Sequence, residues 1–149
     1  MTKTTVKPQH EFGIQRIFIK DLSYEAPNTP ALFKEEWVPK IDFNLHSAAK
    51  KLSADLYEVV LQITVTAKLK EQTAFLVEVK QAGIFILKGF TADLLDQMLG
   101  SFCPNILFPY AREIISSTIN RGGFPPLYLT PINFDAIYQE QLAQQKIKH

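Results

Sequence analysis

The sequence is poor in the residues that build disulfides, metal centres and phosphate sites. Its 149 residues include one cysteine, Cys103, and three scattered histidines, His10, His46 and His149. A lone cysteine cannot form an intrachain disulfide, and these four residues show no zinc-ligand spacing. No glycine-rich loop follows a strand pattern to hold phosphate. We therefore expect no cofactor and no metal site, and the low cysteine content indicates a reducing compartment, by default the cytoplasm.

An excess of charge of one sign is also missing, as are long apolar runs. Sixteen basic and fifteen acidic residues give a net charge of +1, so no whole-protein field attracts nucleic acid or an anionic membrane. No apolar run approaches the roughly 20 residues that span a bilayer, and the first ten residues lack the apolar stretch of a secretory signal. We expect one soluble domain over residues 11–146, between tails at residues 1–10 and 147–149.

Period-two alternation of apolar residues predicts four strands in the first part of the chain. They are expected over about residues 12–24, 38–46, 56–68 and 73–87. A long crossing loop over residues 25–37 carries two prolines, a polar connection covers residues 47–55, and a turn at residues 70–72 joins the last two strands. The first strand is apolar on both faces, with Phe12, Ile14 and Phe18 on one and Ile17 and Ile19 on the other.

Helical periodicity begins after Gly89. Thr91 is expected to cap a short helix that Gly100 ends, and a main helix follows over about residues 105–120. Pro109, about one turn inside, predicts an irregular start or a kink. Asn133 is expected to cap a last helix that carries Phe134, Ile137, Tyr138 and Leu142.

Strands followed by helices predict an α+β domain, a four-stranded antiparallel sheet with helices packed on one face. Both sheet faces and much of the main helix are apolar, which is more apolar surface than one subunit buries. Closed symmetry then favours a homo-oligomer, either a dimer or a tetramer.

Several separated segments resemble the SecB family of protein-export chaperones in the family's order, over nearly the whole chain. The longest are residues 17–28, Ile-Phe-Ile-Lys-Asp-Leu-Ser-Tyr-Glu-Ala-Pro-Asn, and residues 103–113, Cys-Pro-Asn-Ile-Leu-Phe-Pro-Tyr-Ala-Arg-Glu. The resemblance implies a homotetramer, arranged as a dimer of dimers, without nucleotide or catalysis. It implies that the protein holds unfolded secretory precursors in a translocation-competent state and passes them to the SecA motor ATPase of the Sec translocon.

The resemblance also implies a long apolar groove for unfolded polypeptide, with walls at Tyr24, Phe33, Trp37, Tyr138 and Leu142. The strand over residues 38–46, if it lies at a sheet edge, can pair with any extended segment through main-chain hydrogen bonds. Its Ile41, Phe43 and Leu45 would then add apolar contacts. From composition alone, Phe33 and Trp37 folding back on their own core, and the three strand residues facing an ordinary core, remain the alternatives.

Contacts with the motor are implied by the resemblance on the outer sheet face, at Asp21, Glu25, Leu76 and Glu78. Composition alone favours ordinary solvated charges for the three carboxylates. Family members are often strongly acidic with an acidic tail, whereas this chain is nearly neutral and ends Gln-Lys-Ile-Lys-His. We therefore expect weaker attraction to a basic partner here.

The residues give little support to an enzymatic function. Cys103 has apolar neighbours and no nearby histidine, which favours a buried structural thiol. Glu58 and Glu78 on neighbouring strands could form a catalytic carboxylate pair, but their presence is better explained by a solvent-exposed face of the sheet. A small-ligand-binding or lyase-like domain that uses the aromatic residues as a pocket is the alternative function.

Overall fold

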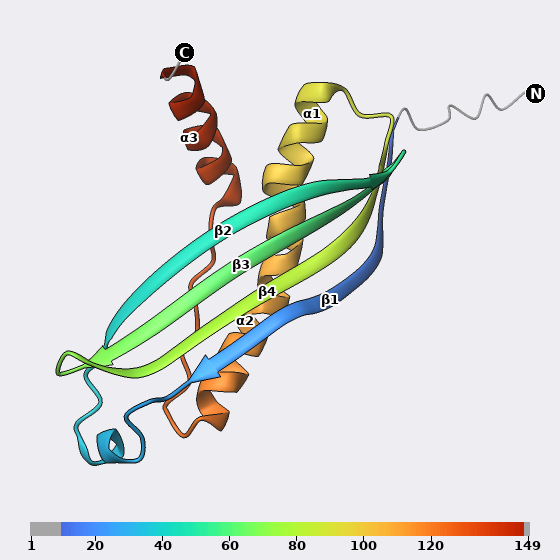
Figure 1. Ribbon diagram of the computed structural model, residues 1–149. Coiled ribbons are helices and arrows are strands. Elements are labelled where there is room, and N and C mark those ends of the chain that lie inside the picture. Colours follow the sequence, from blue (N-terminus) through green and yellow to red (C-terminus); the bar gives the residue numbers. More distant parts are fainter. Residues whose placement is uncertain (1–9, 148–149) are drawn as a thin grey trace, which may run out of the picture.

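The computed structural model describes residues 10–147, which form a four-stranded sheet with helices on one face (Figure 1). The strands are β1 (Glu11–Glu25), β2 (Lys40–Ser53), β3 (Leu56–Leu69) and β4 (Gln72–Lys88), in the antiparallel order β1-β4-β3-β2. The helices are η1 (Ala31–Lys34), α1 (Ala92–Gln97), η2 (Met98–Phe102), α2 (Cys103–Arg121) and α3 (Phe134–Ile147). The expected α+β class is confirmed. Most of the expected tails lie outside the described residues.

The hairpin of β3 and β4 forms the centre of the sheet and agrees with the predicted alternation. Inward-facing side chains such as Val59, Leu61 and Val77 have no exposed surface. Lys70 and Glu71 both have positive φ, 51° and 67°, which matches a two-residue turn whose twist suits antiparallel strands. These two strands therefore supply most of the sheet's contribution to the core.

The long helix α2 packs against β3 and β4 and not across the whole sheet. Its Leu107, Ala111 and Ile115 are fully buried against them. A helix is about 10 Å wide, whereas the axes of four strands span about 14 Å at their usual spacing. The inward-facing side chains of β1 and β2 therefore stay partly uncovered at the two margins of the sheet.

β1 differs from the predicted two-faced strand because its register shifts twice against β4. The shifts lie between Ile14 and Arg16 and between Ile19 and Asp21. Each inserts an extra residue, which turns the following side chains over. Ile17 and Ile19 therefore face inward with Ile14, opposite Gly83 and Gln81, and the expectation that they occupy the other face is wrong.

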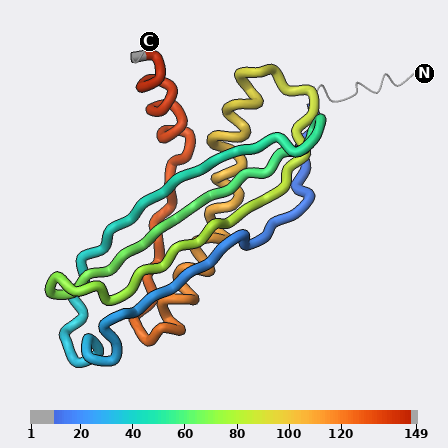
Figure 2. Tube along the Cα trace, viewed as in Figure 1, coloured from blue at the N-terminus to red at the C-terminus, as the bar shows by residue number. Residues whose placement is uncertain are grey.

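β2 is longer than predicted and lies at the sheet edge opposite β1. It continues through the expected polar connection to Ser53, and only Ala54 and Asp55 form the turn. The segment from residue 26 to residue 39 therefore crosses the end of the sheet, as Figure 2 shows in blue to cyan. It is anchored there by the Asn28 side chain, which donates to the Thr73 carbonyl at 2.9 Å.

Gly100 does not end a helix, contrary to the sequence prediction. Helical turns run without a break from α1 through η2 into α2, and η2 is a π-helical segment in which the Cys103 N–H donates to the Met98 carbonyl. The irregularity expected near Pro109 thus lies before α2, which continues through Pro109. Thr91 and Asn133 cap as predicted. No helix within residues 10–147 is long and apolar enough to cross a bilayer.

The Cys103 thiol is predicted to be inert in the folded protein. It is fully buried, and burial raises its pKa to about 12, so almost no reactive thiolate exists at pH 8. Iodoacetamide should therefore label the native protein at least about a hundredfold more slowly than the urea-unfolded protein. Mass spectrometry of timed samples measures both rates, and equal rates would contradict the buried placement.

Candidate functional site

An apolar hollow lies beside the inner face of β2, at the margin of the sheet that α2 does not cover. Its volume is about 340 Å³, and Ile41 and Phe43 of β2 form one wall. The other wall is the extended segment between α2 and α3, with Leu127, Leu129 and Ile132. Phe43 is 41% exposed although it faces the helix side. Leu45, the next inward residue, is half-buried and sits opposite Ile63.

An aromatic cluster lies where the chain crosses from β1 to β2. Two of its residues, Phe33 and Trp37, come shortly before the β2 residues that line the hollow. Trp37 stacks on core residue Phe75 at a ring-centroid distance of 6.2 Å and contacts Phe124 in a tilted arrangement at 5.1 Å. Phe33 also contacts Phe124, at 5.1 Å, yet stays 49% exposed. Trp37 is thus partly a core residue, whereas Phe33 keeps about half of its surface exposed.

Tyr24 joins the same end of the molecule from the other margin. It faces inward from β1, opposite Val77, and its hydroxyl lies against Gly122 so closely that any side chain at position 122 would displace it. Burial raises the pKa of this hydroxyl. Gly123, at φ 89°, lies directly under the Phe33 ring. The turn after α2 therefore contacts both Tyr24 and Phe33. Tyr24 itself does not line the hollow beside β2.

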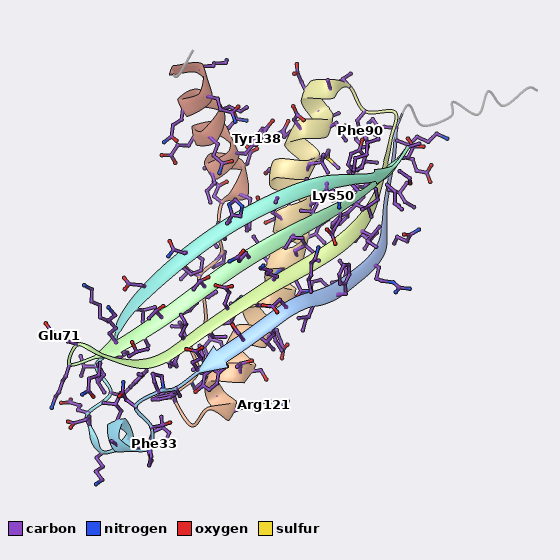
Figure 3. The ribbon with its side chains drawn as sticks, viewed as in Figure 1. Phe33, Lys50, Glu71, Phe90, Arg121 and Tyr138 are labelled. Carbon is purple, nitrogen blue, oxygen red and sulfur yellow. The ribbon has the colours of Figure 1, made fainter. Side chains whose placement is uncertain are left out.

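Tyr138 and Leu142 of α3 lie at the other end of β2. With Ser47 of β2, and with Leu99 and Gly100 of the π-helical segment, they line a second hollow of about 370 Å³. Figure 3 shows Tyr138 pointing from α3 toward the helix that begins at α1, far from Phe33. Burial, and then the neighbouring carboxylates Asp96, Asp93 and Asp135, raise the Tyr138 pKa. The sequence-predicted groove residues thus do not form one cluster: seven of them fall into three groups along the β2 margin, and Tyr24 lies at the β1 margin.

The backbone edge of β2 is open along this margin. Its only strand partner in the described residues is β3, and no main-chain hydrogen bond there joins it to the 125–132 segment. Lysines stand near both ends of the strand, at Lys40, Lys50 and Lys51. Between them lies a stretch of nine residues, 41–49, without a lysine. Lysines commonly protect an exposed strand edge from pairing with another strand, and here they flank residues 41–49, the part of the edge that stays accessible.

The four residues expected to contact the motor share the outer face of the sheet, which no helix covers in the described chain (Figure 1). Cross-strand pairing places Glu25 opposite Leu76, and Ser23 opposite Glu78. Asp21 faces Lys80. Asp21 and Glu25 are exposed on edge strand β1, whereas Leu76 and Glu78 are half-buried on β4. The structure therefore brings these four residues together on one surface.

Three comparisons with known proteins bear on this geometry. The family model described as "Preprotein translocase subunit SecB" matches residues 5–145. The protein-export protein SecB of Methylococcus capsulatus is 52% identical over 148 residues, which cover 98% of this chain and 96% of that relative. The protein-export protein SecB of Legionella pneumophila strain Corby is 56% identical over 136 residues, 91% of this chain and 84% of that relative. The chain belongs to the SecB family.

A solved structure agrees at the level of the fold. The SecB-like chaperone of Mycobacterium tuberculosis, solved in complex with a ChAD peptide from the HigA1 antitoxin, has a TM-score of 0.67 at 17% identity. The match covers 81% of this chain and 90% of that one. Membership of the SecB family identifies the chain as a protein-export chaperone and not an enzyme.

The two glutamates considered as a catalytic carboxylate pair each bond to a different side chain, which agrees with a SecB chaperone. Glu58 is bridged by Lys20 at 3.0 Å, whereas Glu78 accepts a hydrogen bond from Thr64. Glu58 and Thr64 are six positions apart on β3, so the two glutamates do not form a carboxylate pair. The small-ligand-binding or lyase-like alternative, which would use the aromatic residues, is not supported by the comparisons, since they show the SecB family.

Sequence reasoning missed the second wall of the groove in this SecB chain. Leu127, Leu129 and Ile132 line the hollow, and Phe124 links Phe33 to Trp37. The signal was present, because Pro125 and Pro126 prevent helix and the following residues alternate apolar and polar. Without a strand partner, however, such alternation does not say which surface the segment faces.

The contact between Gly100 and Tyr138 is predicted to hold α3 in place. A Cβ at position 100 would lie 2.7 Å from Cδ2 of the Tyr138 ring, so Gly100→Ala should displace α3 and destabilise the protein by about 1–3 kcal/mol. In a Tyr138→Ala background the ring is gone, and the same change should be neutral or stabilising because alanine favours helix. Urea unfolding of the four variants measures this sign reversal, and equal effects in both backgrounds would contradict it.

Proposed function

We propose that this protein is an ATP-independent holding chaperone of the cytoplasm that binds unfolded precursors along the β2 margin. The binding surface, here called the β2 groove, comprises the inner face and free edge of residues 41–49, the 125–132 segment, and the flanking residues Phe33, Trp37, Tyr138 and Leu142. The single observation that carries the proposal is an open strand edge running beside an apolar hollow.

An unfolded chain offers the two kinds of group that the β2 groove can satisfy. Its unpaired backbone N–H and C=O groups can add as a further strand to the β2 edge, which requires no particular sequence. Its apolar side chains can enter the hollow between Phe43 and Leu129. Native proteins have already paired and buried these groups, so the same surface discriminates between unfolded and folded clients.

The structural neighbour supports a peptide-holding role for this fold. The Mycobacterium tuberculosis protein was solved with a peptide bound, and the present chain combines the same fold with an accessible apolar groove. We therefore assign client binding to Tyr24, Phe33, Trp37, Ile41, Phe43, Leu45, Tyr138 and Leu142. Of these, Tyr24 acts through the turn at Gly122 and Gly123, because it lies at the opposite margin.

Delivery to the SecA motor is assigned to the outer face of the sheet. Asp21, Glu25 and Glu78 offer negative charge around the apolar side chain of Leu76. This face is on the opposite side of the sheet from the β2 groove, so one subunit can hold a client and contact the motor at the same time. Charge attraction would raise the association rate more than the final affinity.

One of the two subunit contacts in a homotetramer built as a dimer of dimers is supported by the other margin of the sheet. Ile14, Ile19 and Leu22 of β1 face inward yet are 40–49% exposed, because α2 does not reach them. Tyr110 of α2 is also exposed and shares with Ile19 a hollow of about 490 Å³. A second copy that covered this margin would remove apolar surface from water and pair the free edge of β1.

The function is tested by refolding of a chemically denatured secretory precursor. A sub-stoichiometric amount of the chaperone should slow recovery of the native precursor, and addition after refolding should have no effect. Trp37→Ala should weaken client capture roughly tenfold, the scale of one aromatic anchor at an interface. Stopped-flow fluorescence of the client measures the rate.

Phe90→Ala serves as the control for this experiment. Phe90 is also half-buried but lies at the opposite end of the sheet from Phe33 (Figure 3), so client capture should be unchanged. Refolding that proceeds at its unassisted rate with the wild-type protein present would remove the proposed function. Dissociation of the Trp37 variant into single subunits would show that this residue is structural.

The assembly is tested with two leucines of similar exposure at opposite edges. Leu22 on β1 is 40% exposed and Leu52 near the end of β2 is 44% exposed. Native mass spectrometry should show a tetramer for the wild type and for Leu52→Lys. Leu22→Lys should give smaller species because it places a charge in the subunit contact. A monomeric wild type, or an intact tetramer for Leu22→Lys, would argue against this interface.

A further inference from the structure

The outer face of the sheet carries a transverse row of small polar residues around Glu78. Register places Asn44 of β2, Thr64 of β3, Glu78 of β4 and Ser23 of β1 side by side. Within this row, the Thr64 hydroxyl donates to the Glu78 carboxylate, with Oγ1 and Oε2 2.9 Å apart. The side chain of Glu78 is therefore tied to the neighbouring strand.

Glu78 is the carboxylate of this face that, within the described residues, accepts a hydrogen bond from a neutral side chain. Glu58 is bridged by Lys20 at 3.0 Å, whereas Asp21 and Glu25 have no such side-chain bond in this part of the chain. Within residues 10–147, Glu78 forms no ion pair, and its hydrogen bond comes from a neutral hydroxyl. It is thus a half-buried negative charge that is held in one orientation and left available to a cation.

A tethered carboxylate suits recognition better than a free one. A glutamate side chain has several rotatable bonds, and fixing them at an interface costs conformational entropy. The bond to Thr64 has already fixed them in the free protein. The hydrogen bond occupies one carboxylate oxygen and leaves Oε1 free to accept from an incoming donor.

We propose that Thr64 is a positioning residue for motor binding, which holds the Glu78 carboxylate ready for a cationic side chain of SecA. This inference rests on the proposed function, since it takes the outer face as the motor contact. Leu76 lies two residues from Glu78 on the same face of β4, about 7 Å away. The matching element of the motor therefore presents a lysine or arginine next to an apolar side chain.

Thr64→Val tests the proposal with a nearly isosteric change that keeps β-branching. The matched control is Thr66→Val, on the same strand and face, where Thr66 stands between Leu76 of β4 and Asp42 of β2 and its hydroxyl donates to no carboxylate within the described residues. SecA affinity measured by isothermal titration calorimetry should fall about three- to tenfold for Thr64→Val and change less than twofold for Thr66→Val. Thr64→Ser, which keeps the hydroxyl, should bind like the wild type, and all three variants should hold clients normally.

Two further measurements separate positioning from a structural role. In a Glu78→Gln background, Thr64→Val should cause no additional loss. Glu78→Gln should flatten the dependence of affinity on salt because a charge is removed, whereas Thr64→Val should keep the wild-type slope at lower affinity.

The outcomes distinguish this inference from the proposed function. If Glu78→Gln weakens SecA binding but Thr64→Val does not, or if Thr64→Val weakens it equally in both backgrounds, the positioning role is wrong and the motor contact stands. If the wild-type protein does not bind SecA, the motor contact and the positioning role both fail, while client holding is unaffected.

Discussion

The packing of α2 against β3 and β4 buries the inner faces of those two strands and leaves both margins of the sheet partly open. Ile115 and Val77 have no exposed surface, whereas Ile14 on β1 and Phe43 on β2 are 49% and 41% exposed. A single helix is too narrow to cover four strands. The resulting apolar margins are a consequence of the architecture, and each also ends in a strand edge that no other strand of residues 10–147 pairs with.

The two apolar margins differ in what borders them, and this is why we assign one to subunit contact and the other to client binding. The β1 margin is bordered by α2 and its exposed Tyr110, a broad surface suited to a second rigid copy. The β2 margin is bordered by the 125–132 segment and by α3, which form a narrow groove suited to an extended chain. The outer face carries the carboxylates of the proposed motor contact. The proposed client, subunit and motor contacts thus use separate surfaces.

The sequence predicted those parts of the fold in which alternation and burial coincide. In β3 every second residue is apolar and buried, and β4 keeps the same pattern except at Gln81, so the strands and their turn were predicted nearly to the residue. The bounds of β1 were predicted, but the facing of Ile17 and Ile19 was wrong because the two bulges leave no mark in the pattern. β2 was predicted too short because an edge strand tolerates polar residues such as Ser47 on its inner face. Gly100 was misread because it makes room for Tyr138, a contact 38 positions away. The site residues were named from family resemblance, but their separation into three groups required the structure.

Backbone amide hydrogen exchange with and without an unfolded client tests the central claim most directly. If clients add to the β2 groove, amides in residues 41–49 and 125–132 should become protected, since formerly open groups gain hydrogen bonds or are covered. Exchange in β1 should stay unchanged because that margin is assigned to the contact between subunits and not to the client. Protection confined to β1 or to the outer face, with β2 exchanging as in the free protein, would contradict the account.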